Sequence, residues 1–99
     1  HEAARAAFFL ARIASDRGEH DDAVRSLRMY LDEAPVGDLV VEAQGRLLEE
    51  LVAAGHDVDA QREARAYLLA FPGGAHVDLA RRILEERLEK PLAKPLEAH

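Results

Sequence analysis

The five histidines have the most versatile chemistry in this sequence, because imidazole binds metal ions and exchanges protons near neutral pH. They lie at the two ends of the chain and in the breaks between apolar segments, at His1, His20, His56, His76 and His99. No two of them stand four residues apart on one helix, and the sequence has no cysteine to complete a ligand set. The pattern therefore predicts exposed turn residues, with no metal ion and no cofactor.

A nucleophile or a phosphate site also lacks its usual pattern. Ser15 and Ser26 are the only serines, and neither lies in the Gly-x-Ser-x-Gly context of a hydrolase nucleophile. Gly73 and Gly74 are not followed by the Lys-Ser/Thr pair of a phosphate-binding loop. Carboxylates are numerous, but a charged helical surface supplies them without catalysis. We therefore expect no catalytic residue and no enzyme activity.

Composition and charge limit both the fold and the partners. The 99 residues suffice for one small domain, and with 48% hydrophobic but only 5% aromatic residues the core must be built mainly from Ala, Leu and Val. This favours helices. A net charge of −6 disfavours binding to nucleic acid, and no apolar run is long enough to predict membrane insertion. Because the sequence begins with His1 rather than Met, we expect a piece of a longer or processed protein.

Five segments have apolar residues three or four positions apart, which is the spacing of an amphipathic helix. The spacing predicts helices over about 2–17, 21–34, 38–54, 57–71 and 75–90. Gly18, Pro35, Gly55 and Pro72 separate them, and Pro91 ends the last one. No segment has the strict alternation of a strand.

A shift of 37 residues aligns the sequence with itself. Residues 18–51 match residues 55–88 at 14 of 34 positions. Turn glycines, small residues, tyrosines and prolines recur, in the pairs Gly18/Gly55, Ala23/Ala60, Tyr30/Tyr67 and Pro35/Pro72. Ala6/Ala43 and Leu10/Leu47 extend the register upstream. The first helix is therefore a diverged copy of the third, and the order is two helical hairpins followed by one further helix.

A helix, a glycine turn and a second helix with an early Ala and a final Pro together resemble the tetratricopeptide repeat. The period is 37 rather than about 34, and Ala7 and Gln44 stand where that family has a large aromatic residue. The endings Tyr30-Leu31 and Tyr67-Leu68, each followed by proline, resemble the looser repeats of bacterial cell-envelope proteins. The resemblance implies an all-α solenoid of five antiparallel helices in a right-handed superhelix. It also implies a larger bacterial protein, in the periplasm or envelope rather than the cytoplasm.

The resemblance places a peptide or helix of a partner protein on the concave surface formed by the first helix of each hairpin. The repeat register puts these residues on that surface: Arg5, Phe8, Arg12, Glu42, Gly45, Arg46, Glu49, Leu79, Arg82 and Glu86. Of these, Arg12, Arg46 and Arg82 could pair with acidic groups of a partner. The subclass of the family that clamps chaperone C-termini uses Asn and Lys there. It is not expected, because the sequence has no Asn and its two lysines are Lys90 and Lys94.

These assignments have plainer alternatives. The arginines can instead form surface ion pairs with Glu42, Glu49 and Glu86, each worth ~0–1 kcal/mol. Gly45 lies inside a predicted helix, where glycine costs ~1 kcal/mol relative to alanine. It either opens the surface to a partner's backbone or packs closely against Phe8, and the close contact is the favoured interpretation.

The last predicted helix has no second helix to pack against. Its apolar stripe consists of Val77, Ala80, Ile83, Leu84 and Leu88, and we expect part of it to be exposed. An alternative function is therefore a structural spacer, or a homodimer formed through the 77–88 helix. Residues 91–99 contain Lys-Pro-Leu twice, which predicts an extended tail that is a linker or folds back on this edge.

Overall fold

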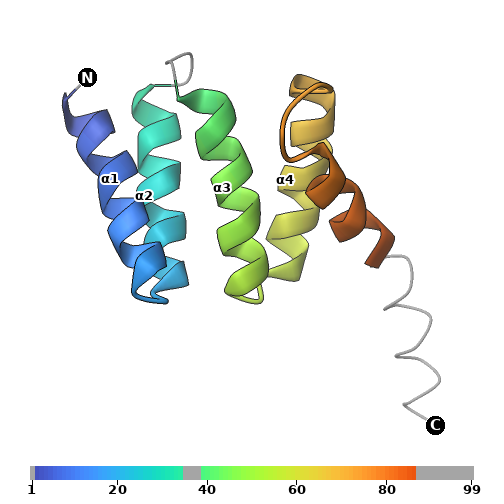
Figure 1. Cartoon of the computed structure of the whole chain (residues 1–99), viewed down its shortest axis with the longest axis horizontal. Coiled ribbons are helices and arrows are strands. Elements are labelled where there is room, and N and C mark those ends of the chain that lie inside the picture. Colours follow the sequence, from blue (N-terminus) through green and yellow to red (C-terminus); the bar gives the residue numbers. More distant parts are fainter. Residues whose placement is uncertain (1, 35–38, 87–99) are drawn as a thin grey trace, which may run out of the picture.

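The computed structural model describes residues 2–34 and 39–86, which form helices and the short connections between them. The labelled helices are α1 (Glu2–Asp16), α2 (His20–Glu33), α3 (Val40–Ala53) and α4 (Asp57–Ala70). A fifth helix covers residues 77–86. The four labelled helices lie side by side and antiparallel in one row, and each packs against the next (Figure 1). The all-α prediction is confirmed, and the described part of the chain contains no strand.

Each labelled helix begins and ends within two residues of the range expected from the sequence. The differences lie at the helix ends, where the hydrogen-bonding pattern changes gradually. Pro35 and residues 87–99 lie outside the described residues. The expected end of the last helix, with Leu88, and the 91–99 tail therefore fall there too.

α1 and α3 end in the same backbone turn. Gly18 follows α1 with a φ of 75°, and Gly55 follows α3 with a φ of 79°. Such left-handed angles favour glycine, which has no Cβ to collide with the backbone. The next N–H groups, of Glu19 and His56, donate to carbonyls five residues earlier at 2.8 and 2.9 Å. This is the Schellman helix ending, and it directs the chain into α2 and α4.

Two buried tyrosines join the end of one helix to the start of the next. The Tyr30 hydroxyl of α2 accepts a hydrogen bond from the N–H of Leu39 (3.2 Å), and the Tyr67 hydroxyl of α4 accepts one from His76 (3.1 Å). Both donors lie just before a helix, where N–H groups have no partner within the helix. Donors and acceptors are each 37 residues apart, so the sequence register recurs in the hydrogen bonding. The position of the Tyr67 hydroxyl also requires glycine at residue 74, because a Cβ there would collide with this hydroxyl.

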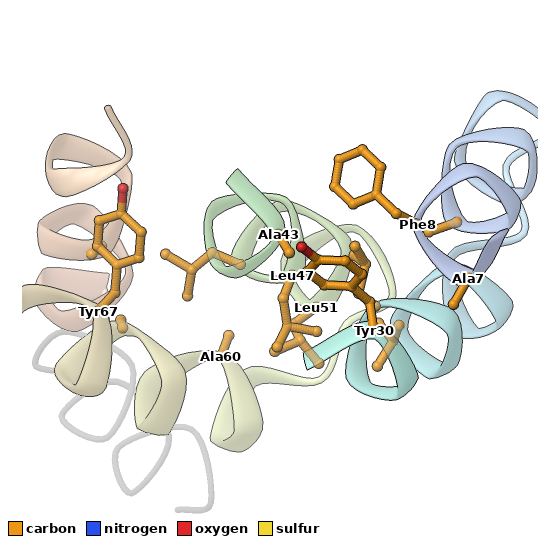
Figure 2. Packing of buried hydrophobic residues seen from close by; sticks show 14 of the residues in the cluster. Ala7, Phe8, Tyr30, Ala43, Leu47, Leu51, Ala60 and Tyr67 are labelled. Carbon is orange, nitrogen blue, oxygen red and sulfur yellow. The ribbon is translucent and has the colours of Figure 1, made fainter. Parts of the chain in front are cut away.

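Small residues let the helices pack closely. Several alanines have no exposed surface: Ala23, Ala43, Ala64 and Ala80. Figure 2 shows Ala43 with Leu47 and Leu51 on α3, between Tyr30 on one side and Tyr67 on the other. A core with few aromatic rings is dense here because alanine keeps neighbouring helices close.

Candidate functional site

An open pocket of about 470 Å³ lies between α3, the α4 side chain Tyr67 and the segment before the fifth helix. We call it the α3 groove; it is lined by Val41, Glu42, Arg46, Glu49, Tyr67, Ala75 and His76. Three of the residues expected to contact a partner, Glu42, Arg46 and Glu49, therefore share one surface. Their spacing of four and three residues places them on one face of α3.

The charged side chains of the α3 groove are already paired with one another. Arg46 Nε donates to Glu42 Oε2 at 3.0 Å, and its guanidinium carbon lies 5.8 Å from the centre of the Phe8 ring. Glu49 Oε2 lies 2.7 Å from His76 Nε2. The Glu42 and Glu49 side chains are nevertheless about half exposed, at 49% and 51%. Arg46 thus forms the ion pair of the plainer alternative, and the groove offers two accessible carboxylates.

Phe8 is expected on the binding surface, but it lies in the core with 4% of its surface exposed. Its ring packs edge-on against Tyr30 of α2, with centroids 5.6 Å apart. Burying a phenyl ring removes a large apolar area from water, and the edge-on geometry adds a favourable aromatic contact. Phe8 therefore packs in the core, where its ring lies next to the Arg46 guanidinium, rather than facing a partner.

Gly45 is buried, and the neighbour that requires glycine differs from the one expected. A Cβ at this position would collide with the imidazole ring of His76. The close contact is therefore with the segment before the fifth helix and not with Phe8. No sequence pattern indicates this contact, because the partners lie 31 positions apart and His76 resembles an ordinary turn residue. Gly45 is also too covered for the backbone of a partner to reach it.

The other expected residues lie elsewhere. Arg5 and Arg12 are exposed on α1. Arg82 and Glu86 line a second pocket of about 180 Å³, whose other walls are Val52, Asp57, Ala60, Gln61, Leu79 and Ile83. Among the described residues, no ion pair joins Arg12 or Arg82 to a carboxylate. The expected set therefore divides into an α3 groove, a smaller pocket and separate arginines of α1.

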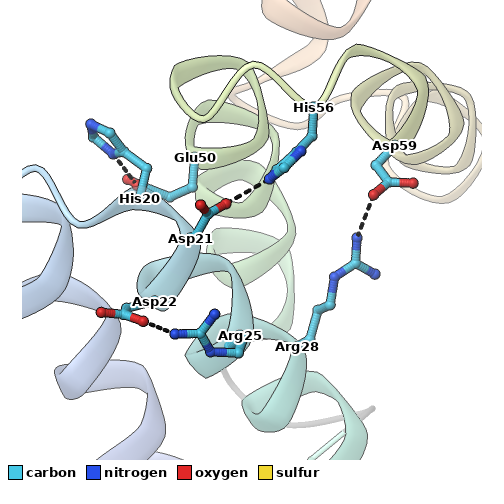
Figure 3. A network of polar contacts seen from close by, with 8 residues as sticks. All are labelled: His20, Asp21, Asp22, Arg25, Arg28, Glu50, His56 and Asp59. Atoms are coloured by element: carbon cyan, nitrogen blue, oxygen red, sulfur yellow. Dashed lines mark hydrogen bonds and ion pairs between the residues drawn. The ribbon is translucent and has the colours of Figure 1, made fainter.

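A buried carboxylate that the sequence analysis missed connects three helices. Glu50 of α3 has 6% of its surface exposed. Its Oε2 accepts a hydrogen bond from Ser15 Oγ of α1 at 2.6 Å. Its Oε1 lies 2.6 Å from His20 Nδ1 of α2 (Figure 3). The available signal is that Glu50 follows Ala43 and Leu47 on the apolar stripe of α3. A charge at such a position indicates a buried polar contact.

Ser15, His20 and Glu50 are the residue types of a hydrolase triad, but their order is different. In a triad the histidine lies between serine and carboxylate and accepts the serine proton. Here the carboxylate lies between the other two, so Ser15 donates directly to Glu50. A carboxylate hydrogen bond does not activate a serine hydroxyl in that way. The cluster instead connects α1, α2 and α3 through polar side-chain contacts.

Three further contacts connect the hairpins. His56 Nε2 lies 2.6 Å from Asp21 Oδ1, and Arg28 of α2 lies 3.9 Å from Asp59 of α4 (Figure 3). Arg28 also lies 3.5 Å from Glu63 of α4. Exposed ion pairs of this kind contribute little to stability. The expectation that the histidines are simple turn residues is nevertheless incomplete, because His20, His56 and His76 each contact a carboxylate of another helix.

Within residues 2–34 and 39–86, no three His, Asp or Glu side chains are grouped so that they could hold a metal ion. In the same part of the chain, no helix has the length and apolar character needed to span a bilayer. Comparison of the chain with protein-family models, with curated proteins and with solved structures found no significant match. A functional proposal therefore depends on the geometry described above.

Proposed function

We propose that this chain is a tetratricopeptide-like repeat module, part of a larger bacterial protein, whose α3 groove holds a peptide or helix of a partner protein. The observation that carries the proposal is the recurrence of backbone geometry at the 37-residue spacing. Turn glycines, helix endings and tyrosine hydrogen bonds repeat together. Stacked hairpins of this kind use their surface for binding other proteins.

The chemistry of the α3 groove supports a protein partner. Val41 has 42% of its surface exposed beside the half-exposed carboxylates of Glu42 and Glu49. An apolar side chain next to charged groups suits an amphipathic segment, since it offers both burial and charge pairing. Because the paired Glu42 and Glu49 side chains remain 49% and 51% exposed and the Arg46 side chain only 35%, we expect the partner to present cationic rather than acidic groups. This reverses the polarity that the arginines alone suggested.

The alternative function, a homodimer through the 77–88 helix, gains no support from the described residues. Arg81 and Glu85 are exposed on this helix, whereas Ala80 and Ile83 are buried. Leu88 lies outside the described residues. The described part of this helix therefore offers a polar surface, which is a poor homodimer interface.

A peptide library displayed on phage, selected against the chain, tests the proposal. The selected peptides are synthesised, and their dissociation constants are measured by fluorescence anisotropy. The test variant is Glu49→Lys, which reverses one groove charge. The matched control is Glu33→Lys, which makes the same change at an exposed site at the end of α2.

We expect Glu49→Lys to weaken binding at least about tenfold, which corresponds to about 1.4 kcal/mol, and Glu33→Lys to leave it nearly unchanged. Circular dichroism must show that both variants are folded. If the selected peptides bind Glu49→Lys as tightly as the original chain, the α3 groove is not the binding surface. A preference for acidic peptides would retain the groove and reject the charge argument.

A further inference from the structure

α1 carries an exposed apolar stripe at the end of the row of helices. Phe9 is 53% exposed, Leu10 is 56% exposed and Ile13 is 49% exposed. Ala6, one turn earlier, is exposed as well. Positions 6, 9, 10 and 13 share one helix face. We call these four residues the α1 stripe. α1 lies at one end of the row of helices, and no other described segment lies beyond it (Figure 1).

Most of the corresponding face of α3 is buried. A shift of 37 residues maps Ala6, Leu10 and Ile13 onto Ala43, Leu47 and Glu50, which are 0%, 1% and 6% exposed. Phe9 maps onto Arg46, whose side chain is 35% exposed and lines the α3 groove. α2 lies against this side of α3, and its residue His20 contacts Glu50. In the next hairpin, the preceding helix α2 therefore covers most of the face of α3 that corresponds to the exposed face of α1.

The fifth helix provides a second comparison. The positions that match Ala6 and Phe9 are Ala80 and Ile83, which are 0% and 7% exposed. The residues Arg81 and Glu85 of this helix are exposed. The two ends of the row thus differ, because the described part of the fifth helix offers charged side chains to solvent and α1 offers apolar ones.

We infer that the α1 stripe docks an amphipathic helix of a partner, packed antiparallel to α1 as α2 packs on α3. The stripe has Ile13 where α3 has Glu50, so the docked helix carries an aliphatic residue where α2 has His20. Val24 and Leu27 are buried in α2, and the docked helix carries apolar residues at the equivalent positions. This surface is separate from the α3 groove and does not depend on the function proposed for it.

The chain supplies its own probe for this inference. A copy of residues 19–37, joined directly before His1, stands in the same register to α1 as α2 does to α3. His20 of the copy is changed to Leu so that it faces Ile13. We expect the extended chain to melt at least about 4 °C higher than the original, because the added helix covers the α1 stripe.

Two controls separate docking from a general effect of the added residues. One carries Leu27→Glu and Leu31→Glu in the copy, and the other carries Leu10→Glu in the recipient helix. Both are expected to melt no higher than the original chain. An extended chain that is not stabilised, or a control that is stabilised equally, overturns the inference. Sedimentation of the original chain is expected to give a monomer; a dimer that Leu10→Glu abolishes would assign the stripe to a second copy and overturn the proposed occupant.

Discussion

The hydroxyl groups of Tyr67 and Tyr30 occupy equivalent positions in the two hairpins. A Tyr→Phe substitution at either residue removes only the hydroxyl oxygen. Tyr67→Phe leaves the N–H of His76 without its acceptor, and Tyr30→Phe does the same to the N–H of Leu39. Both rings are buried, with 2% and 3% exposed, so the apolar contacts stay the same. The loss in stability therefore reports the hydrogen bond.

The magnitude follows from the burial of donor and acceptor. An intramolecular hydrogen bond contributes about 0.5–1.5 kcal/mol net, and an unpaired buried donor costs about 1–3 kcal/mol. Because Leu39 and His76 are only half-buried, water reaches the freed N–H in part. We expect each substitution to cost about 1 kcal/mol, and the double variant about 2 kcal/mol since the two sites share no partner. Each kcal/mol lowers the Tm of a chain of this size by about 4–8 °C.

Urea unfolding followed by circular dichroism measures these values. A double-mutant cycle with Gly74→Ala adds a matched control, because a Cβ at Gly74 would collide with the Tyr67 hydroxyl. Gly74→Ala should therefore cost less in the Tyr67→Phe background than in the original chain. Unchanged stability in either single variant, or a Gly74→Ala cost that is independent of residue 67, would refute the reasoning.

Three further predictions concern contacts between helices and one helix-ending turn, and each is tested by urea unfolding. Glu50→Ala removes the acceptor of two hydrogen bonds and should cost about 2–3 kcal/mol, whereas Ser15→Ala removes one and should cost about 1 kcal/mol; equal costs would contradict the shared-carboxylate geometry. Gly45→Ala should destabilise the chain through the collision with His76, and His76→Ala should remove most of that penalty, so a penalty that persists locates the collision elsewhere. Gly18→Ala should cost about 1–2 kcal/mol because of its left-handed φ, and a smaller loss would mean that the turn adopts another conformation.

The helices and their turns followed from local chemistry. A left-handed turn needs glycine, so Gly18 and Gly55 marked two helix ends without knowledge of the fold. The repeat register also placed Glu42, Arg46 and Glu49 on one face of α3, and all three line the α3 groove. The opposite wall of the groove did not. His76 contacts Glu49 of α3 and lies against Gly45, and neither contact is indicated by the helical period.

The errors have a common physical cause. The repeat register places Phe8 on the partner surface and packs Gly45 against Phe8, because a register gives the direction of a side chain but not what lies in front of it. The ring of Phe8 meets Tyr30, and Gly45 meets His76. The contacts of Glu50 with Ser15 and His20 require three helices to meet at one point. In the sequence, only the charged residue within the apolar stripe of α3 indicates them.

By itself, the sequence determined an all-helical chain, the places where its helices end and the 37-residue register, because these depend on the backbone preferences and spacing of nearby residues. Only the tertiary structure decided which faces are covered. Ala43 is buried and Ala6 is exposed in the same register, since α2 covers one and no described helix covers the other. Whether a residue is buried depends on the helix that packs against it as well as on the residue itself. Only the tertiary structure shows which helix that is.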